Sequence, residues 1–260
     1  MSQSWIRMAG ALMVTVAGLS AQSAAVQKQP QPKSQKEMEA VMAIFNAADP
    51  DGRIKAAEEL LSKYADTEFK SVALQVAAAS AQEKNDFEKM TIYSERTLEA
   101  DPKNYGAMLM LATGIPQRTR EFDLDKEEKL GRAEKFAKMA QDVLKDAPKP
   151  RPDITDEDWT GHRKNFLSQA HEALGLVAMV RKKYDVAVTE FKTSVDIAAA
   201  PDPATKVRLG SAYIFAGKYD DAIAVLDPLL AEPELNPVIR QFAQQEKTRA
   251  MQGKSGAEKK

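Results

Sequence analysis

The sequence predicts an all-α protein, an α-solenoid of helix-turn-helix repeats that ends in a capping helix. Two observations predict this class. Between residues 165 and 233, one pattern of apolar and small residues occurs twice, with an offset of 35 residues. Apolar residues also recur at helical spacing through most of the remaining chain. A period in the mid-thirties with that spacing indicates stacked helix pairs, each of which buries its apolar face only against its neighbours.

The duplicated pattern has small residues at fixed places. In each copy a Leu-Gly pair is followed by Tyr and Ala, nine and twelve residues after the glycine. Small side chains at the glycine and alanine positions let two helices cross closely, because larger ones would force the helices apart. The two sets are Leu174, Gly175, Tyr184, Ala187, Phe191 and Val195, and Leu209, Gly210, Tyr219, Ala222, Leu226 and Leu230.

The second copy resembles the tetratricopeptide repeat (TPR), since Leu209, Gly210, Tyr213, Gly217, Tyr219 and Ala222 stand in that family's order and spacing. The resemblance implies a solenoid that holds other proteins on the inner surface formed by the first helix of each pair. These inner positions, mostly apolar and uncharged polar, would suit a helical or extended segment of a partner protein. They lack the Lys, Asn and Arg set with which some members bind a C-terminal carboxylate. The family's inner positions fall on Gln75, Ala79 and Gln82, on Gln169, Glu172, Leu176 and Met179, and on Val207, Ser211 and Ile214.

The other repeats are less regular. Apolar spacing and breaking residues predict a first pair over 37–45 and 54–64, and a second over 69–83 and 87–98. Gly114 and Pro116 should end a helix that starts at Tyr105, before an inserted segment and a helix over 125–145. About five pairs plus a polar C-terminal cap are expected in one continuous domain, residues 37–252. The proline-rich stretch at 147–154 should be its flexible connector, followed by a long helix that Thr155 and Asp158 cap.

Residues 1–25 read as a signal peptide. Arg7 precedes a short apolar run from Met8 to Leu19, small residues follow, and the first acidic residue is Glu37. Cleavage is expected between residues 22 and 26, and an uncleaved membrane anchor is the alternative. The sequence has no cysteine, which excludes disulfides and lipid attachment through cysteine. An exported, periplasmic protein is expected, in contact with the membrane only through the signal segment before cleavage. Residues 26–36 should form a flexible linker, and 253–260 a disordered tail.

The charge balance disfavours nucleic-acid binding, because 37 basic residues nearly cancel 38 acidic ones. Enzyme motifs are also missing: the sequence contains no nucleophile elbow, phosphate-binding glycine loop or dinucleotide fingerprint. His162 and His171 should face opposite sides of a helix, since nine residues turn by about 900°. No catalytic activity, cofactor or metal is therefore expected.

One short segment resembles a calcium-binding EF-hand loop. Asp49, Asp51, Gly52, Ile54 and Glu58 match its third, fifth, sixth, eighth and twelfth positions. The first ligand position is Ala47, which cannot coordinate a cation, and no second loop is present to pair with it. A capped turn between two repeat helices is the favoured interpretation.

The sequence therefore predicts a non-catalytic scaffold or adaptor of the bacterial cell envelope. The alternative is a structural subunit whose repeats stack on copies of itself, forming a homo-oligomer. The identity of the partner protein is not encoded in any recognisable motif.

Overall fold

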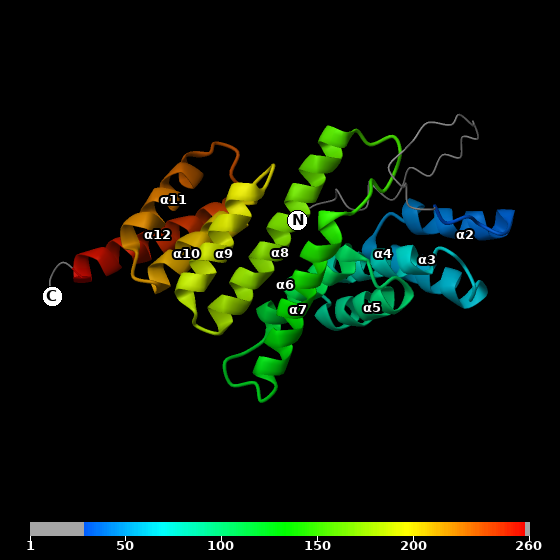
Figure 1. Cartoon of the computed structure of the whole chain (residues 1–260), viewed down its shortest axis with the longest axis horizontal. Helices are drawn as coiled ribbons and strands as arrows, with labels where there is room; N and C mark the ends of the chain where they lie inside the picture. Colours follow the sequence, from blue (N-terminus) through cyan, green and yellow to red (C-terminus); the bar gives the residue numbers. More distant parts are fainter. Residues whose placement is uncertain (1–28, 258–260) are drawn as a thin grey trace. The chain divides into compact units, whose positions relative to one another are not determined.

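The computed structural model describes residues 29–257, which form eleven α-helices and contain no β-strand (Figure 1). The helices follow one another as five pairs and a single last helix, α12 (Pro237–Ala257). The predicted all-α solenoid with a C-terminal capping helix is thereby confirmed. None of the described helices is both long enough and apolar enough to cross a membrane. The predicted signal peptide, residues 1–25, lies outside the described residues.

The chain divides into two compact units, whereas the repeat pattern predicted one continuous domain. The division falls within α6 (Tyr105–Arg118), whose residues up to Leu111 belong to the first unit. Residues 146–154, which contain the predicted proline connector, belong to the first unit as well. The backbone of this segment is irregular, and Pro150 accepts a hydrogen bond from the Gln29 side chain at 2.6 Å.

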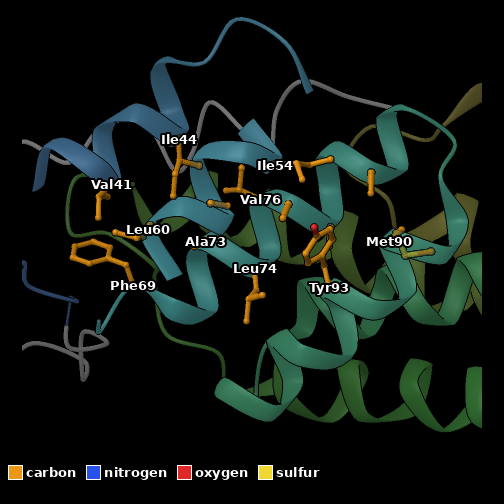
Figure 2. Packing of buried hydrophobic residues seen from close by; sticks show 14 residues of the cluster. Val41, Ile44, Ile54, Leu60, Phe69, Ala73, Leu74, Val76, Met90 and Tyr93 are labelled. Carbon is orange, nitrogen blue, oxygen red and sulfur yellow. The ribbon is translucent and has the colours of Figure 1, made fainter. Parts of the chain in front are cut away.

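The first unit is built on two complete helix pairs. Its core collects aliphatic and aromatic side chains from both pairs, and Ile44, Leu60, Phe69 and Leu74 are at most 1% exposed (Figure 2). Four alanines of the third helix, Ala73, Ala77, Ala78 and Ala81, are buried in this core. The helices are α2 (Gln35–Asn46), α3 (Pro50–Lys63), α4 (Lys70–Glu83) and α5 (Phe87–Ala100).

The second unit contains the duplicated pattern. After the remainder of α6, its helices are α7 (Lys126–Lys145), α8 (Asp156–Val180), α9 (Tyr184–Ile197), α10 (Pro203–Phe215), α11 (Tyr219–Ala231) and α12. Ala112 of α6, Ala137 of α7 and Ala173 of α8 pack in one small cluster, so these helices approach closely. The Thr155 hydroxyl accepts a hydrogen bond from the Asp158 N–H at 3.0 Å, which confirms the predicted cap of α8.

The turns inside three of the pairs share one backbone conformation. Asn85, Lys182 and Gly217 have positive φ angles of 59°, 59° and 72°, and each lies two residues before the aromatic residue that starts the next helix. In each turn the following N–H donates to the carbonyl five residues back, at 2.8–2.9 Å. This is the left-handed end of a helix that glycine adopts with least strain, and it fixes the direction of the second helix.

Gly217 gives a direct test of this turn. Gly217→Ala should lower the free energy of unfolding by about 1–2 kcal/mol, the cost of a left-handed conformation for a residue with a Cβ atom. An added Cβ meets nothing within 4 Å, so the effect comes from the backbone alone. Gly131 lies in α7, and an added Cβ there also meets nothing within 4 Å. Gly131→Ala should therefore raise the free energy of unfolding by about 0.5–1 kcal/mol. Urea unfolding of both variants measures the difference, and equal effects would contradict the turn assignment.

Three segments differ from their predicted structure. Helix α6 continues through Pro116 to Arg118, because proline removes only one hydrogen bond near the helix end. The Thr119 hydroxyl then donates to the Ile115 carbonyl at 2.8 Å and closes that end. Helix α2 starts at Gln35, inside the predicted linker, where the Ser34 hydroxyl accepts from the Glu37 N–H.

Helix α12 runs to Ala257, five residues into the predicted disordered tail. Gly253 lies so close to Tyr219 that an added Cβ would come within 2.3 Å of the ring. Lys254 forms an ion pair with Asp220 at 2.6 Å. The same link occurs one repeat earlier, where Lys218 pairs with Asp185 at 2.7 Å. Helix α12 therefore docks on α11 in the way that a further repeat would.

Candidate partner-binding site

The candidate site lies on the helix pairs of the second unit, whose two helices cross closely. Gly175 of α8 faces the fully buried ring of Phe191 in α9, and an added Cβ would lie 2.6 Å from that ring. Gly210 of α10 faces Leu226 of α11 in the same way, with a Cβ distance of 2.9 Å. In each pair the contact joins residues 16 apart, as 191 − 175 and 226 − 210 show. The predicted repeat register is therefore confirmed in the second unit.

A buried ion pair connects the two first helices, α8 and α10. The Glu172 carboxylate binds the Arg208 guanidinium, and Glu172 is 8% exposed. Burial raises the pKa of the Glu172 carboxyl group, while Arg208 and the Thr205 hydroxyl favour the ionised form. A charged pair at this depth fixes the spacing of the two helices, because either group alone would be buried without a partner.

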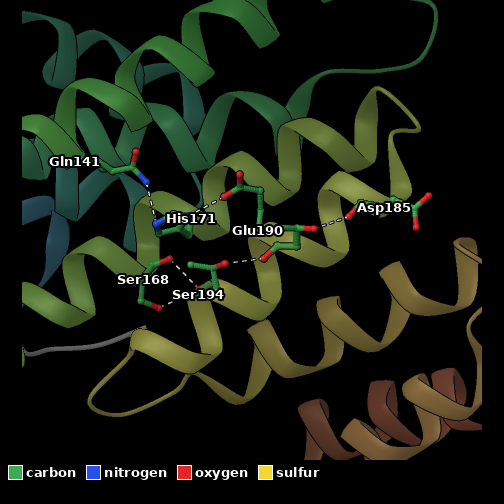
Figure 3. Close-up of polar contacts among 8 residues, drawn as sticks. Gln141, Ser168, His171, Asp185, Glu190 and Ser194 are labelled. Atoms are coloured by element: carbon green, nitrogen blue, oxygen red, sulfur yellow. Dashed lines mark hydrogen bonds and ion pairs between the residues drawn. The ribbon is translucent and has the colours of Figure 1, made fainter.

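A second polar network joins α7, α8 and α9 (Figure 3). His171 Nδ1 lies 2.8 Å from Glu190 Oε2, and His171 Nε2 lies 3.1 Å from the Gln141 side-chain nitrogen. These contacts suit an imidazole that donates from Nδ1 and accepts at Nε2. One turn earlier on α8, the hydroxyls of Ser168 and Ser194 lie 2.9 Å apart. The network holds three helices together and engages both ring nitrogens of His171.

The predicted inner positions of the second unit lie on α8 and α10, and all except Glu172 are partly exposed. The six partly exposed residues are called the first-helix face. They are Gln169, Leu176 and Met179 on α8, and Val207, Ser211 and Ile214 on α10. Leu176 and Met179 pack against the core between α8, α9 and α10. Val207 packs in the next cluster, beside Leu230 and Ile239. Glu172 differs from its predicted role, because its carboxylate is engaged inside the chain by Arg208.

The remaining inner positions belong to the first unit. Gln75 and Gln82 lie on α4 and are partly exposed, as is Ala79. The Gln75 side chain accepts a hydrogen bond from the Asn104 amide at 3.0 Å, which fixes its orientation. The structure thus places six predicted residues on α8 and α10 of the second unit and the others on α4 of the first unit.

The EF-hand-like segment forms a helix start. The Asp49 carboxylate accepts a hydrogen bond from the Gly52 N–H at 2.8 Å and caps α3. Asp51 is paired with Lys84, and Glu58 accepts a hydrogen bond from the Tyr93 hydroxyl. Burial, followed by this contact with Glu58, raises the pKa of Tyr93 to about 12. The capped turn favoured from the sequence is confirmed. The described residues contain no cluster of three or more side chains able to hold a metal ion.

Comparisons with known proteins found similarity only among solved structures. No protein-family model matches the chain, and neither does any curated protein. A thermophilic TPR protein of Thermus thermophilus is 18% identical, with a TM-score of 0.49, over 76% of this chain and 90% of its own. An assembly chaperone of RpL4 is 13% identical, with a TM-score of 0.44, over 86% of this chain and 99% of its own. A tetratricopeptide repeat protein of Parabacteroides merdae is 14% identical, with a TM-score of 0.42, over 87% of this chain and 93% of its own.

Proposed function

We propose that this tetratricopeptide-like α-solenoid is a non-catalytic adaptor, which holds a segment of a partner protein on the first-helix face. The observation that carries the proposal is the arrangement of α8 and α10. Apolar side chains that are partly exposed stand one repeat apart on two helices whose spacing a buried ion pair fixes. A rigid surface of this kind loses little conformational entropy of its own when it binds a segment.

The chemistry of the face indicates the kind of segment that it binds. Leu176, Met179 and Ile214 offer apolar contacts, whereas Gln169 and Ser211 offer uncharged hydrogen-bonding groups. Met179 and Ile214 lie four residues beyond Gly175 and Gly210, about one helical turn, so both helices present apolar groups at the same level. This pattern suits an amphipathic helix or an extended apolar segment more than an acidic or basic tail.

Paired substitutions test the binding role. Ser211→Arg with Ile214→Gln places a bulky polar surface on the first-helix face, and we expect it to abolish capture of the partner. Because both sites are partly exposed, the thermal midpoint should change little. The matched control is Thr189→Arg with Val186→Gln on the exposed side of α9, which should retain binding. Loss of binding in the control alone would refute the proposal.

We further propose that the adaptor works in the bacterial envelope, after export to the periplasm. The support is the sequence of residues 1–25, with one basic residue, a short apolar run and small residues. The expected result is a mature chain that begins between Gln22 and Val26. Intact-mass measurement of the protein from its native host decides this, and a full-length mass would show that the segment is retained.

A further inference from the structure

The described part of the chain leaves eight large apolar side chains exposed, and six of them belong to two parts of the second unit. Two belong to the loop between α6 and α7. Four belong to α12 and to the end of α10, but Met251 follows Phe242 by nine residues and therefore lies on the opposite face of α12. Exposed apolar groups mark interaction sites where they share one surface, whereas single exposed groups are ordinary surface. The six residues are Phe122, Leu124, Phe215, Val238, Phe242 and Met251.

The first place is the acidic tip, residues 121–125, with the sequence Glu-Phe-Asp-Leu-Asp. Phe122 and Leu124 are 90% and 106% exposed, so both side chains project fully into solvent. The loop is nevertheless well anchored. The Asp123 carboxylate accepts hydrogen bonds from the Arg120 N–H and the Lys129 ammonium, both at 3.1 Å. These contacts turn the polar side chain inward and leave the two apolar side chains outward.

One further contact stabilises the tip. Glu121 forms an ion pair with Lys182 at the end of α8. The backbone hydrogen bond from Arg120, and then Lys129, hold the pKa of Asp123 below its usual value, so its carboxylate stays ionised. An ordered loop displays its apolar groups without losing much conformational entropy on binding.

The second place is the aromatic patch, which comprises Phe215 of α10 with Val238, Phe242 and Arg249 of α12. The last three differ by four and seven residues, so they share one face of the helix. The Arg249 guanidinium lies over the Phe215 ring, 5.2 Å from its centre. Phe215 in turn stacks on Tyr184, with ring centres 5.1 Å apart. The patch is therefore a preformed surface of aromatic groups with a cation at its edge.

The formal charges of the two places differ in sign, although most of the charged groups form ion pairs within the chain. Residues 121–128 contain five acidic residues and one lysine. Helix α10 contains two basic residues and no acidic one, and α12 contains four basic residues and one acidic residue. Arg249, although it pairs with Glu246 at 2.7 Å, keeps 46% of its side chain exposed and so can reach an incoming carboxylate.

We propose that the acidic tip of one copy of this chain docks on the aromatic patch of a second copy. Phe122 and Leu124 would cover Phe215 and Phe242, and an acidic neighbour of Phe122 would face Arg249. Acidic residues on both sides of each apolar group would be repelled by anionic lipid headgroups, which disfavours a lipid surface as the occupant. The chain itself supplies a matching partner, aromatic and edged by a cation. This inference does not depend on partner binding by the first-helix face.

The contact is head-to-tail, because the tip and the patch are different surfaces of one unit. Such contacts leave one free tip and one free patch on every open complex, so they extend into chains or close into rings. Two projecting side chains bury a small area, so the association should be weak and reversible. Oligomers should therefore grow with protein concentration and dissociate on dilution.

Sedimentation equilibrium of the purified chain, from about 10 µM to about 1 mM, tests this proposal. The average mass of the natural chain should rise across the range and fall again in high salt. Phe122→Ser with Leu124→Ser, and separately Phe242→Ser, should each leave a monomer throughout. Val186→Ser removes an exposed apolar group of α9, 49% exposed, and should leave the association unchanged. Circular dichroism confirms that each variant is folded.

Mixing the two association-deficient variants gives the sharpest result. The tip variant retains its patch and the patch variant retains its tip, so the equimolar mixture should form a heterodimer. That heterodimer cannot extend, because its remaining tip and patch are both altered. A monomeric natural chain, unchanged association in either variant, or a mixture that stays monomeric would each overturn the proposal. Binding of phosphatidylglycerol vesicles that the tip variant loses, without self-association, would overturn it in favour of lipid.

Discussion

Replacing Arg208 with methionine should lower the free energy of unfolding by about 3 kcal/mol at neutral pH. The substitution keeps most of the apolar stem and removes the only cation in the described structure that forms an ion pair with the Glu172 carboxylate. Glu172 is 8% exposed, so its charge would remain in a poorly solvated site. We place the effect at the lower end of the usual range, because the Arg208 side chain is 30% exposed.

The cost of Arg208→Met should depend on pH. Burial raises the pKa of Glu172 in the folded state above its unfolded value, about 4.3. A carboxyl group with a raised pKa stabilises the fold at pH values below the unfolded pKa. This contribution is lost as the pH rises through the folded-state pKa. Removing Arg208 raises the folded-state pKa further, so the variant should be least affected in mild acid and most affected at neutral pH.

Urea unfolding at several pH values measures this dependence. Adding Glu172→Gln to the Arg208→Met chain should remove the pH dependence, because glutamine does not titrate. Its side chain can still accept a hydrogen bond from the Thr205 hydroxyl. An equal loss of stability in mild acid and at neutral pH would show that Arg208 acts through packing rather than charge.

The second large effect concerns the crossing of α8 and α9. Phe191→Ala should lower the free energy of unfolding by about 3–5 kcal/mol, because the ring is fully buried. Gly175→Ala should lower it by about 1–3 kcal/mol, since the added Cβ would lie 2.6 Å from that ring. The two effects should not add. Once the ring is removed, the alanine has room and also favours the helix.

Gly161→Ala, earlier on α8, is the matched control for this cycle. Its added Cβ would meet only Ala199, at an ordinary contact distance of 3.9 Å. The substitution should therefore be neutral or stabilising, by up to about 1 kcal/mol. Urea unfolding of the single and double variants gives the coupling energy. Additive losses from Gly175→Ala and Phe191→Ala would contradict the observed helix register.

The repeat register could be predicted from the sequence because the same steric requirement occurs twice. Gly175 and Gly210 are separated by one period, and each has a large buried side chain 16 residues later. The turn residues repeat with the same period, as Lys182 and Gly217 do. Local rules of this kind involve residues close in the chain, so composition and spacing reveal them.

The parts of the structure that were not predicted depend on contacts between repeats. Glu172 and Arg208 are 36 residues apart, and neither position shows a pattern that identifies the other. The division within α6 depends on how each half packs, because α6 is an uninterrupted helix that continues through Pro116. The end of α12 is stabilised by Tyr219 and Asp220, which no property of residues 253–257 reveals.

Site-specific photo-cross-linking in the native host shows whether the first-helix face binds the partner. The photoreactive residue p-benzoylphenylalanine is introduced at Ser211 or Ile214 of α10, and at the exposed Thr189 of α9 as the control. We predict that both α10 positions cross-link to the same protein and that Thr189 does not. Cross-linking of that protein from Thr189, with none from Ser211 or Ile214, would contradict the account and place the binding surface on the opposite side of the repeats.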